Sequence, residues 1–400
     1  MIVCNFYKII PFIPHSTLLV AGCSILIYFG INKNDYFYKF INYKIIIFTG
    51  LISYSLYLWH WPIISLLKYL KLNDLSTFDL FLCFLLTYFF SILSWKFVEQ
   101  AFLKSKNFKK LISYISLSYL FLIILSLQIL FNKNFPSRYE DLPNRLAEAV
   151  GSTYYCSINE YKQFGDTYAC EINTKIKKKP EIVLFGNSHA HMYGWGLKKT
   201  LIKFEKKGLT IPLNSCLPTI DKNISIKCLK KANSYYKSII ENKDIKTVII
   251  GLTWYSLNLI DEKGNRNISE TDRNNSLIYL MDKLQSFNKE VYLIGPIPIP
   301  GYDIASISSR ELALKKDSKK KLYSSREDFF NKYLASINFF KKKLKENFLE
   351  SFDILCDKKN CNFIDLKGSN FSDSNHLSKY GSEKMADLFK ILFQNNPKLK

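Results

Sequence analysis

The sequence predicts an α-helical membrane segment followed by an α/β domain with a mainly parallel sheet in three layers. Residues 1–131 hold long apolar runs, whereas residues 132–400 are polar and rich in lysine. From residue 180 onward, short apolar runs suited to buried strands alternate with longer stretches suited to helices. The chain of 400 residues has room for two or three domains, and we expect them at 1–131, 132–179 and 180–400.

Four segments in the first part are long and apolar enough to cross a bilayer, which needs roughly 20 mostly apolar residues. They cover about 9–30, 44–67, 77–98 and 111–131. Lysines gather in the first and third loops between these segments and are fewer on the other side. The first and third loops hold Lys33, Lys39, Lys44, Lys104, Lys106, Lys109 and Lys110. The other side holds Lys8, before the first segment, and Lys68 and Lys71, in the middle loop. The positive-inside rule therefore predicts that these loops are cytoplasmic and that residues 132–400 lie on the outer side.

The cysteines support an oxidising compartment for the second part. Cys4, Cys23 and Cys83 lie in the membrane part, where a lone thiol is usually a small apolar residue. The other six form three local couples, which we predict to be disulfides on the ground of proximity. The couples are Cys156 with Cys170, Cys216 with Cys228, and Cys356 with Cys361. A zinc site would need Cys-x-x-Cys spacing, and no metal-ligand set is expected, including His15, His189 and His191.

The net charge of +22 is the signal that would favour nucleic-acid binding. Only six of the 56 basic residues are arginine, however, and arginine is the usual reader of base edges. We therefore expect no nucleic-acid partner.

The α/β pattern fixes where a ligand should bind. Strands are predicted at Glu181–Phe185, Leu209–Leu213, Lys246–Leu252 and Glu290–Gly295, and helices at His189–Lys206 and about 231–242, 270–288, 325–349 and 379–395. In such doubly wound sheets, ligands lie beyond the C-terminal ends of the strands. Residues 132–179 lack this alternation and are predicted to be a linker plus a disulfide-closed extension.

A serine follows the first of these strands, in the run Gly186-Asn187-Ser188-His189. A serine at a strand-to-helix turn is exposed at the sheet edge, and the helix N-terminus can face an oxyanion. Far downstream, Asp373 and His376 lie three residues apart, just before the last predicted helix. A histidine can take the serine proton, and a carboxylate can orient the histidine. The plain alternative is that Ser188 caps a helix and Asp373 begins a turn, but both motifs together favour a catalytic triad.

These two motifs, GNSH at 186–189 and DSNHLS at 373–378, resemble those of the SGNH (GDSL-like) hydrolase superfamily. The resemblance covers about residues 180–395. It implies that Ser188 is the nucleophile, His376 the base and Asp373 the acid that orients it. The family's third block usually holds an asparagine that donates to the oxyanion, and Trp254 stands in that place here.

The departure at Trp254 leaves the oxyanion donors open. The candidates are the Ser188 amide with a neighbour in Asn214-Ser215. Trp254 itself is either a platform for a sugar or part of the core, and we favour the core. His189 lies beside the pocket or is simply a residue of the first helical turn.

The membrane part carries a second resemblance. Residues 53–62 (SYSLYLWHWP) and 94–102 (SWKFVEQAF) resemble the late helices of the acyltransferase family 3 membrane proteins, with Ala101 in place of a proline. His60 and Glu99 are polar groups near membrane depth and are therefore functional candidates. The alternative is that His60 belongs to an interfacial aromatic belt with Trp59 and Trp61.

Together the two resemblances imply a bacterial O-acyltransferase, most simply an O-acetyltransferase, for a cell-envelope polysaccharide or glycolipid. They imply a multi-pass protein of the inner membrane with a periplasmic SGNH domain that needs no cofactor, and acetyl-CoA as acyl donor to the complete membrane domain. The family's earlier helices have no counterpart here. We therefore expect the chain to be the C-terminal part of a longer protein, or to work with a separate polypeptide that supplies them. The same triad could serve a carbohydrate esterase or deacetylase, and an inactive remnant or glycan-binding domain is the third possibility.

Overall fold

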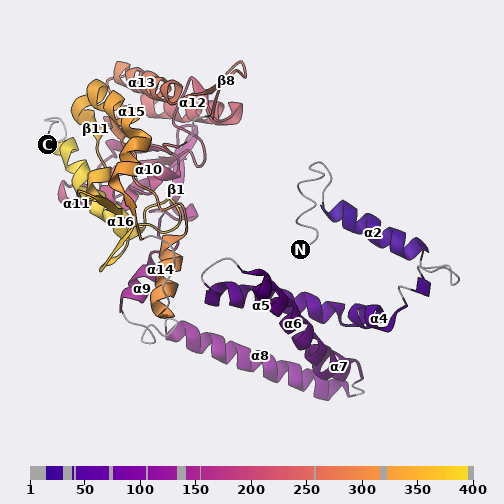
Figure 1. Ribbon diagram of the computed structural model, residues 1–400. Coiled ribbons are helices and arrows are strands. Elements are labelled where there is room, and N and C mark those ends of the chain that lie inside the picture. The colour runs from indigo at the N-terminus through magenta and orange to yellow at the C-terminus, as the bar shows by residue number, and fades with distance from the viewer. Residues whose placement is uncertain are drawn as a thin grey trace. The chain divides into compact units, whose positions relative to one another are not determined.

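The computed structural model describes residues 15–29, 38–39, 42–71, 75–104, 107–132, 141–153, 155–255, 258–315 and 322–394. The chain divides into two compact units, Met1–Asn132 and Lys133–Lys400 (Figure 1). The expected positions Cys4, Lys8, Lys33 and Lys106 lie outside the described residues, as does part of the segment 9–30.

The first unit is helical. Its helices are α2 (His15–Phe29), α4 (Lys44–Leu51), α5 (Ser53–Lys71), α6 (Thr77–Ser94), α7 (Gln100–Lys104) and α8 (Phe108–Phe131). A π-helical turn, η2 (Trp95–Glu99), joins α6 to α7. Helices α5 and α6 pack together, with the rings of Trp59 and Phe90 stacked at 5.1 Å between centroids. Ser76 caps α6 by accepting a hydrogen bond from the amide of Asp79, so the helix begins at a defined residue.

Two helices of the described part of this unit are long and apolar enough to cross a membrane. They are Thr77–Lys104 and Ile112–Phe131, which coincide with two of the four expected segments. The segment 44–67 is divided between α4 and α5 at Ile52, and α5 contains Pro62 and several polar side chains. The four expected membrane spans are thus not shown, and two candidates stand.

The second unit is built on a mostly parallel sheet of seven strands. Its order is β1 (Tyr161–Phe164), β2 (Thr167–Ile172), β4 (Gly208–Pro212), β3 (Ile182–Gly186), β6 (Thr247–Gly251), β9 (Glu290–Ile294) and β11 (Phe348–Leu349). The strands from β4 to β11 run parallel, whereas β1 and β2 are antiparallel. Every residue of β3 and β6, and all of β9 after Glu290, is buried, for example Val183, Ile249 and Leu293, as expected of a sheet covered on both faces.

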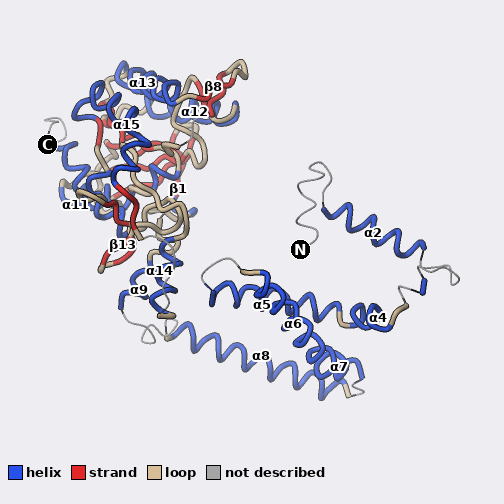
Figure 2. The backbone as a smooth tube through the Cα atoms, in the orientation of Figure 1, coloured by secondary structure: helices blue, strands red, loops and turns tan. Residues whose placement is uncertain are grey.

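Helices cover both faces of this sheet (Figure 2). One core cluster joins the sheet to α12 (Ile226–Glu241), α13 (Glu270–Ser286) and α15 (Arg326–Leu344). The other joins it to α11 (Gly194–Lys203), α14 (Ile304–Ala313), η7 (Met385–Lys390) and α17 (Ile391–Gln394). Helix α9 (Asp141–Glu148) lies beside α14. The short helix α10 (Ser188–His191) contacts β3, β4 and β6 where β3 stops, and α16 (Lys379–Lys384) packs on α11. The second unit is therefore a three-layer α/β domain.

Short strands and turns complete the domain. Strands β5 (Lys222–Asn223), β7 (Asn258–Asp261) and β8 (Arg266–Ile268) form a small sheet. Two-stranded ladders pair β10 (Tyr323–Ser325) with β12 (Asn360–Asn362) and β13 (Ile364–Asp365) with β14 (Gly368–Ser369). Short 3₁₀ turns occur at η4 (Ile158–Glu160), η5 (Lys345–Asn347) and η6 (Phe352–Ile354).

The sequence prediction misses several features of the domain, among them α14 and the division of the predicted last helix into α16, η7 and α17. The extension within 132–179 is not merely a closed loop, because β1 and β2 pair with β4 and extend the main sheet. The helix predicted at His189–Lys206 is broken between α10 and α11, and the predicted helix 325–349 ends at Leu344 and gives way to β11. The missed strands are short, and their pairing depends on distant residues rather than on local periodicity.

All three predicted disulfides are confirmed. Cys156 is bonded to Cys170, Cys216 to Cys228, and Cys356 to Cys361. The first ties the residues before β1 to β2, and the second ties the loop after β4 to α12. A native disulfide is worth about 2–4 kcal/mol, so we expect each bond to stabilise the domain.

Candidate active site

Ser188 lies where β3 gives way to α10. The Asn187 side chain accepts a hydrogen bond from the His189 amide at 3.0 Å and donates to Thr253 Oγ1 at 2.9 Å, so the turn is held at both ends. Gly186 has φ 152°, and a Cβ there would lie 1.8 Å from the carbonyl oxygen of Gly251. The turn that presents Ser188 therefore depends on a glycine at position 186.

The structure brings Ser188, Asp373 and His376 together. His376 Nε2 lies 2.9 Å from Ser188 Oγ, and His376 Nδ1 lies 2.8 Å from Asp373 Oδ2. The two ring nitrogens thus bridge a hydroxyl and a carboxylate across 188 residues of sequence. This is the geometry of a nucleophile, a base and a group that orients the base.

Asp373 is held in its ionised form. Burial raises the pKa of its carboxyl, but hydrogen bonds from the His376 imidazole and from the amides of Asn375 and His376 outweigh burial and lower the pKa to about 2. An ionised carboxylate accepts only, so Nδ1 of His376 carries the proton. In the neutral imidazole, Nε2 then carries no proton and can accept the one on Ser188.

The loop that carries Asp373 and His376 is anchored to several parts of the domain. The Ser374 carbonyl accepts from the Gly301 amide at 2.8 Å, and Asn375 Nδ2 donates to Tyr255 Oη at 3.3 Å. The Ser372 amide donates to the His376 carbonyl at 2.9 Å. These bonds fix the imidazole before any substrate arrives, which is the usual requirement for a site that acts by positioning.

A cavity of about 870 Å³ opens beside the triad. Ser188 and His376 both line it, together with the predicted oxyanion candidates Asn214 and Ser215. The remaining residues of its wall are Cys156, Tyr161, Tyr168, His191, Pro212 and Tyr235. The tyrosines were not foreseen from the sequence, and they give the cavity a largely aromatic wall.

Trp254 lies in the core and is not among the described residues that line the cavity. It is 6% exposed, and its Nε1 donates to the Ile294 carbonyl at 3.2 Å. The guanidinium of Arg273 lies 5.0 Å from the Trp254 ring and also bonds the Trp254 carbonyl. The tryptophan therefore fixes the loop after β6 rather than facing the substrate.

The Ser188 amide is occupied in this arrangement. It donates to the Asn214 carbonyl at 3.1 Å, and Asn214 has φ 56°. Asn214 and Ser215, in the loop after β4, line the cavity together with Ser188, and they remain candidates for the oxyanion donors.

His189 and His191 are buried on either side of this region, at 5% and 6% exposure. The His189 ring lies 5.0 Å from that of His376 and 6.0 Å from that of Tyr255. Burial, with a smaller effect from His376, lowers the pKa of His189 to about 3. Burial also lowers the pKa of His191 to about 4. Both rings are therefore neutral near pH 7 and place no positive charge beside His376.

The two buried histidines predict an acid-sensitive domain. A histidine in the unfolded chain binds a proton near pH 6.5, whereas these rings stay neutral down to about pH 4 or 3. The unfolded state thus binds more protons as the pH falls below about 6.5, and the free energy of unfolding decreases. The Tm of the full chain in detergent, followed by intrinsic fluorescence, should fall between about pH 6.5 and about pH 4.5.

His189→Phe tests the source of this dependence because it keeps a ring and removes one titrating group. Its Tm should fall less steeply over the same interval. Asp373, with a pKa of about 2, loses its stabilising effect only below about pH 4, outside this window. Equal slopes in the wild type and the variant would assign the acid sensitivity to other groups.

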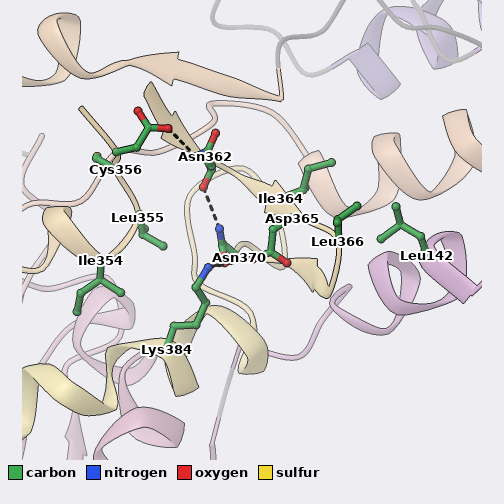
Figure 3. Close-up of a pocket in the computed structure, with 11 residues that line it drawn as sticks. Leu142, Ile354, Leu355, Cys356, Asn362, Ile364, Asp365, Leu366, Asn370 and Lys384 are labelled. Carbon is green, nitrogen blue, oxygen red and sulfur yellow. Dashed lines mark hydrogen bonds and ion pairs between the residues drawn. The ribbon is translucent and has the colours of Figure 1, made fainter. Parts of the chain in front are cut away.

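A second cavity, of about 580 Å³, shares no described lining residue with the first (Figure 3). Its polar groups are bonded to one another. Asn370 Nδ2 donates to the Asn362 carbonyl at 2.9 Å, and Lys384 Nζ donates to both Asn370 Oδ1 and Asp365 Oδ2 at 3.0 Å. These groups satisfy each other, so we assign the chemistry to the cavity with the triad. Among the residues that the structure describes, no three His, Cys, Asp or Glu side chains gather as metal ligands would.

In the first unit, the two expected membrane motifs meet through Ser55 and Glu99. Ser55 Oγ donates to Glu99 Oε2 at 3.4 Å. His60 Nδ1 lies 2.6 Å from the carbonyl of Tyr57, within its own helix. Glu99 is thus joined to the helix that carries His60, whereas the His60 side chain makes its hydrogen bond within its own helix.

A Ser-His-Asp constellation at the carboxyl edge of a mostly parallel sheet defines an α/β domain of the hydrolase type. The sequence model of the family described as "SGNH domain (fused to AT3 domains)" matches residues 155–390, and the chain belongs to this family. No family model of the membrane acyltransferase helices matches the first unit.

Comparison with solved structures finds the periplasmic domain of the lipopolysaccharide acetyltransferase of Salmonella ser. Paratyphi A. The TM-score is 0.41 at 18% identity, and the match covers 55% of this chain and 85% of that chain. A comparison with curated proteins finds no match.

Proposed function

We propose that the protein is an O-acyltransferase, most simply an O-acetyltransferase, that modifies a cell-envelope polysaccharide or glycolipid through an acyl-Ser188 intermediate. The observation that carries the proposal is the bridge that His376 makes between Ser188 and Asp373, at 2.9 Å and 2.8 Å. Membership in a family described as fused to AT3 domains supports transfer, because such a partner domain would supply acyl groups.

The proposed chemistry has two steps with one base. His376 Nε2 takes the proton of Ser188 as the serine oxygen attacks the acyl carbonyl, and the proton then passes to the leaving group. In the second step, Nε2 takes the proton of a sugar hydroxyl as that oxygen attacks acyl-Ser188. The ester bond to the sugar forms, the bond to Ser188 breaks, and the proton returns to Ser188.

The proposal places the triad domain outside the cytoplasm, in the periplasm of a bacterium. Three disulfides are typical of an oxidising compartment, and the two candidate membrane helices would hold the protein in the inner membrane. The acyl donor, acetyl-CoA in the simplest case, would react with a membrane domain of the acyltransferase family 3 (AT3) type. His60 and Glu99 are our candidates for that part of the path.

The esterase alternative uses the same triad with water as the acceptor. His376 and Asp373 side chains are 18% and 45% exposed, so water can reach them. The discriminating experiment gives the full chain in detergent an activated acetyl ester, with and without envelope glycan, and measures acetyl-sugar and free acetate. A transferase gives acetyl-sugar in excess over acetate at saturating glycan. Acetate alone, at a rate that glycan does not change, would replace our proposal with an esterase.

A further inference from the structure

Three tyrosines line the triad cavity, and the acyl-transfer chemistry uses none of them. Tyr161 and Tyr168 come from the β1–β2 hairpin, and Tyr235 comes from α12. We propose that these rings form a subsite for an uncharged sugar ring of the acceptor, and that the hairpin thereby selects the acceptor. This inference rests on the proposed function and adds the chemical class of the sugar.

The register of the hairpin sets Tyr161 and Tyr168 on one face. Tyr161 pairs with Cys170 and Gln163 pairs with Tyr168, and residues directly opposite in an antiparallel pair share a face. Since alternate residues of a strand also share a face, both tyrosines point to the same side of the sheet. Both line the cavity that holds Ser188, and Tyr168 is 57% exposed, which leaves its ring available to a ligand.

The hairpin is held rigidly against the rest of the domain. The Cys156–Cys170 disulfide closes it at one end. At the other end, the Asp166 amide donates to Ser238 Oγ at 2.9 Å, and Gly165 packs so closely that a Cβ there would lie 2.6 Å from the same oxygen. Ser238 lies three residues after Tyr235 on α12, so the same helix anchors the hairpin and supplies the third ring. A wall fixed in this way loses little entropy when a ligand binds.

The chemistry of the wall fits a neutral sugar. The apolar C–H faces of a pyranose pack on aromatic rings, and its hydroxyls need a few hydrogen-bonding groups, which Asn214 and Ser215 offer. The described residues that line the cavity include no Asp, Glu, Lys or Arg. Lys231 approaches the Tyr235 ring, at 5.3 Å from its centroid, and donates to the Leu213 carbonyl at 3.4 Å. A carboxylate or phosphate on the sugar would thus lose water without gaining a dedicated cation in the cavity wall.

Tyr161 adds a hydrogen-bonding hydroxyl group to this wall. Its Oη lies 3.4 Å from Nδ1 of His191, a buried residue of α10 that also lines the cavity. The hydrogen bond joins the hairpin to the helix that begins at Ser188. The contact therefore links the proposed sugar platform directly to the helix that carries the nucleophile.

Binding in an inactive chain tests this inference apart from the proposed function. The full chain carrying Ser188→Ala, in detergent micelles, is titrated with methyl glycosides of glucose, galactose, mannose and rhamnose, and with methyl glucuronide and galacturonide. Ligand-observed saturation-transfer NMR gives each dissociation constant. We expect binding of at least one neutral glycoside and weaker binding of the uronides. Tyr168→Ala in the same background should raise the neutral glycoside's dissociation constant about fivefold.

Two matched variants separate the tyrosine ring from damage to the hairpin. Tyr168→Phe keeps the ring and should restore most of the affinity. Lys162→Ala changes an exposed side chain on the opposite face of the hairpin and should leave the dissociation constant unchanged. Absence of neutral-sugar binding, equal binding of uronides, or unchanged binding in Tyr168→Ala would each overturn the inference. Sugar binding that depends on Tyr168, in a protein whose wild type transfers no acetyl group, would instead refute the proposed function alone.

Discussion

Replacing Ser188 with alanine should abolish the acyl-protein and lower acetyl transfer by about 10³- to 10⁶-fold, because the whole path runs through one oxygen. His376 Nε2 lies 2.9 Å from that oxygen and is placed to take its proton. Without the hydroxyl, the base can activate only water or sugar directly, and no covalent intermediate forms. The measurement is the intact mass of the full chain after exposure to an activated acetyl ester, followed by quantification of acetyl-sugar.

Ser286→Ala is the matched control for this experiment. Ser286 is exposed at the end of α13, where its hydroxyl donates to the Lys283 carbonyl, and the same side-chain change there should leave acylation and transfer intact. An acetyl adduct that persists in Ser188→Ala, and is discharged by sugar as in the wild type, would assign the nucleophile to another residue.

Replacing Gly186 with alanine should destabilise the domain more than any surface change in it. The residue has φ 152°, and its new Cβ would lie 1.8 Å from the Gly251 carbonyl and 2.9 Å from Ala190 Cβ. Gly251 belongs to β6, the central neighbour of β3, so neither strand can move aside without breaking the ladder. We expect a loss of about 4 kcal/mol or more, seen as a fall in Tm of about 10 °C.

Gly264→Ala separates backbone strain from the steric clash. Gly264 also has a positive φ, of 86°, but nothing lies within 4 Å of the Cβ that alanine would add. Strain alone costs about 1–2 kcal/mol, so this variant should lose much less stability than Gly186→Ala. Equal Tm values for the two variants would show that the close approach of β3 and β6 is not what requires the glycine.

The parallel strands could be predicted from the sequence because burial on both faces leaves continuous apolar runs. Strands β3, β4, β6 and β9 each lie within two residues of the expected bounds. The positions of Ser188, Asp373 and His376 followed from the same pattern, because one lies at a strand end and two lie just before the last helical region. The motifs suggested that these three residues act together, but only the fold shows that they lie within hydrogen-bond distance.

The tyrosine wall of the triad cavity, which we propose to face the sugar, could not be predicted in the same way. The run Tyr161–Ile172 contains Gly165-Asp166 between two short strands, which is a local hairpin signal that could have been used. Nothing local indicates that its tyrosines meet Tyr235 from α12, because that depends on the Ser238 anchor. Trp254 shows the opposite case. It stands where the family usually has an oxyanion donor, yet the sequence favours the core for its ring, and Arg273 and the Ile294 carbonyl hold it there.

The bond between Cys156 and Cys170 has a consequence for how the protein matures. Both thiols are reduced when the chain is synthesised, since the cytoplasm keeps cysteines in that state. The sheet itself needs no oxidant, because β2 pairs with β4 through its backbone. In the proposed topology, the bond that closes the hairpin carrying Tyr161 and Tyr168 therefore forms after the domain has crossed the membrane. The proposed sugar subsite thus gains its covalent closure only after export.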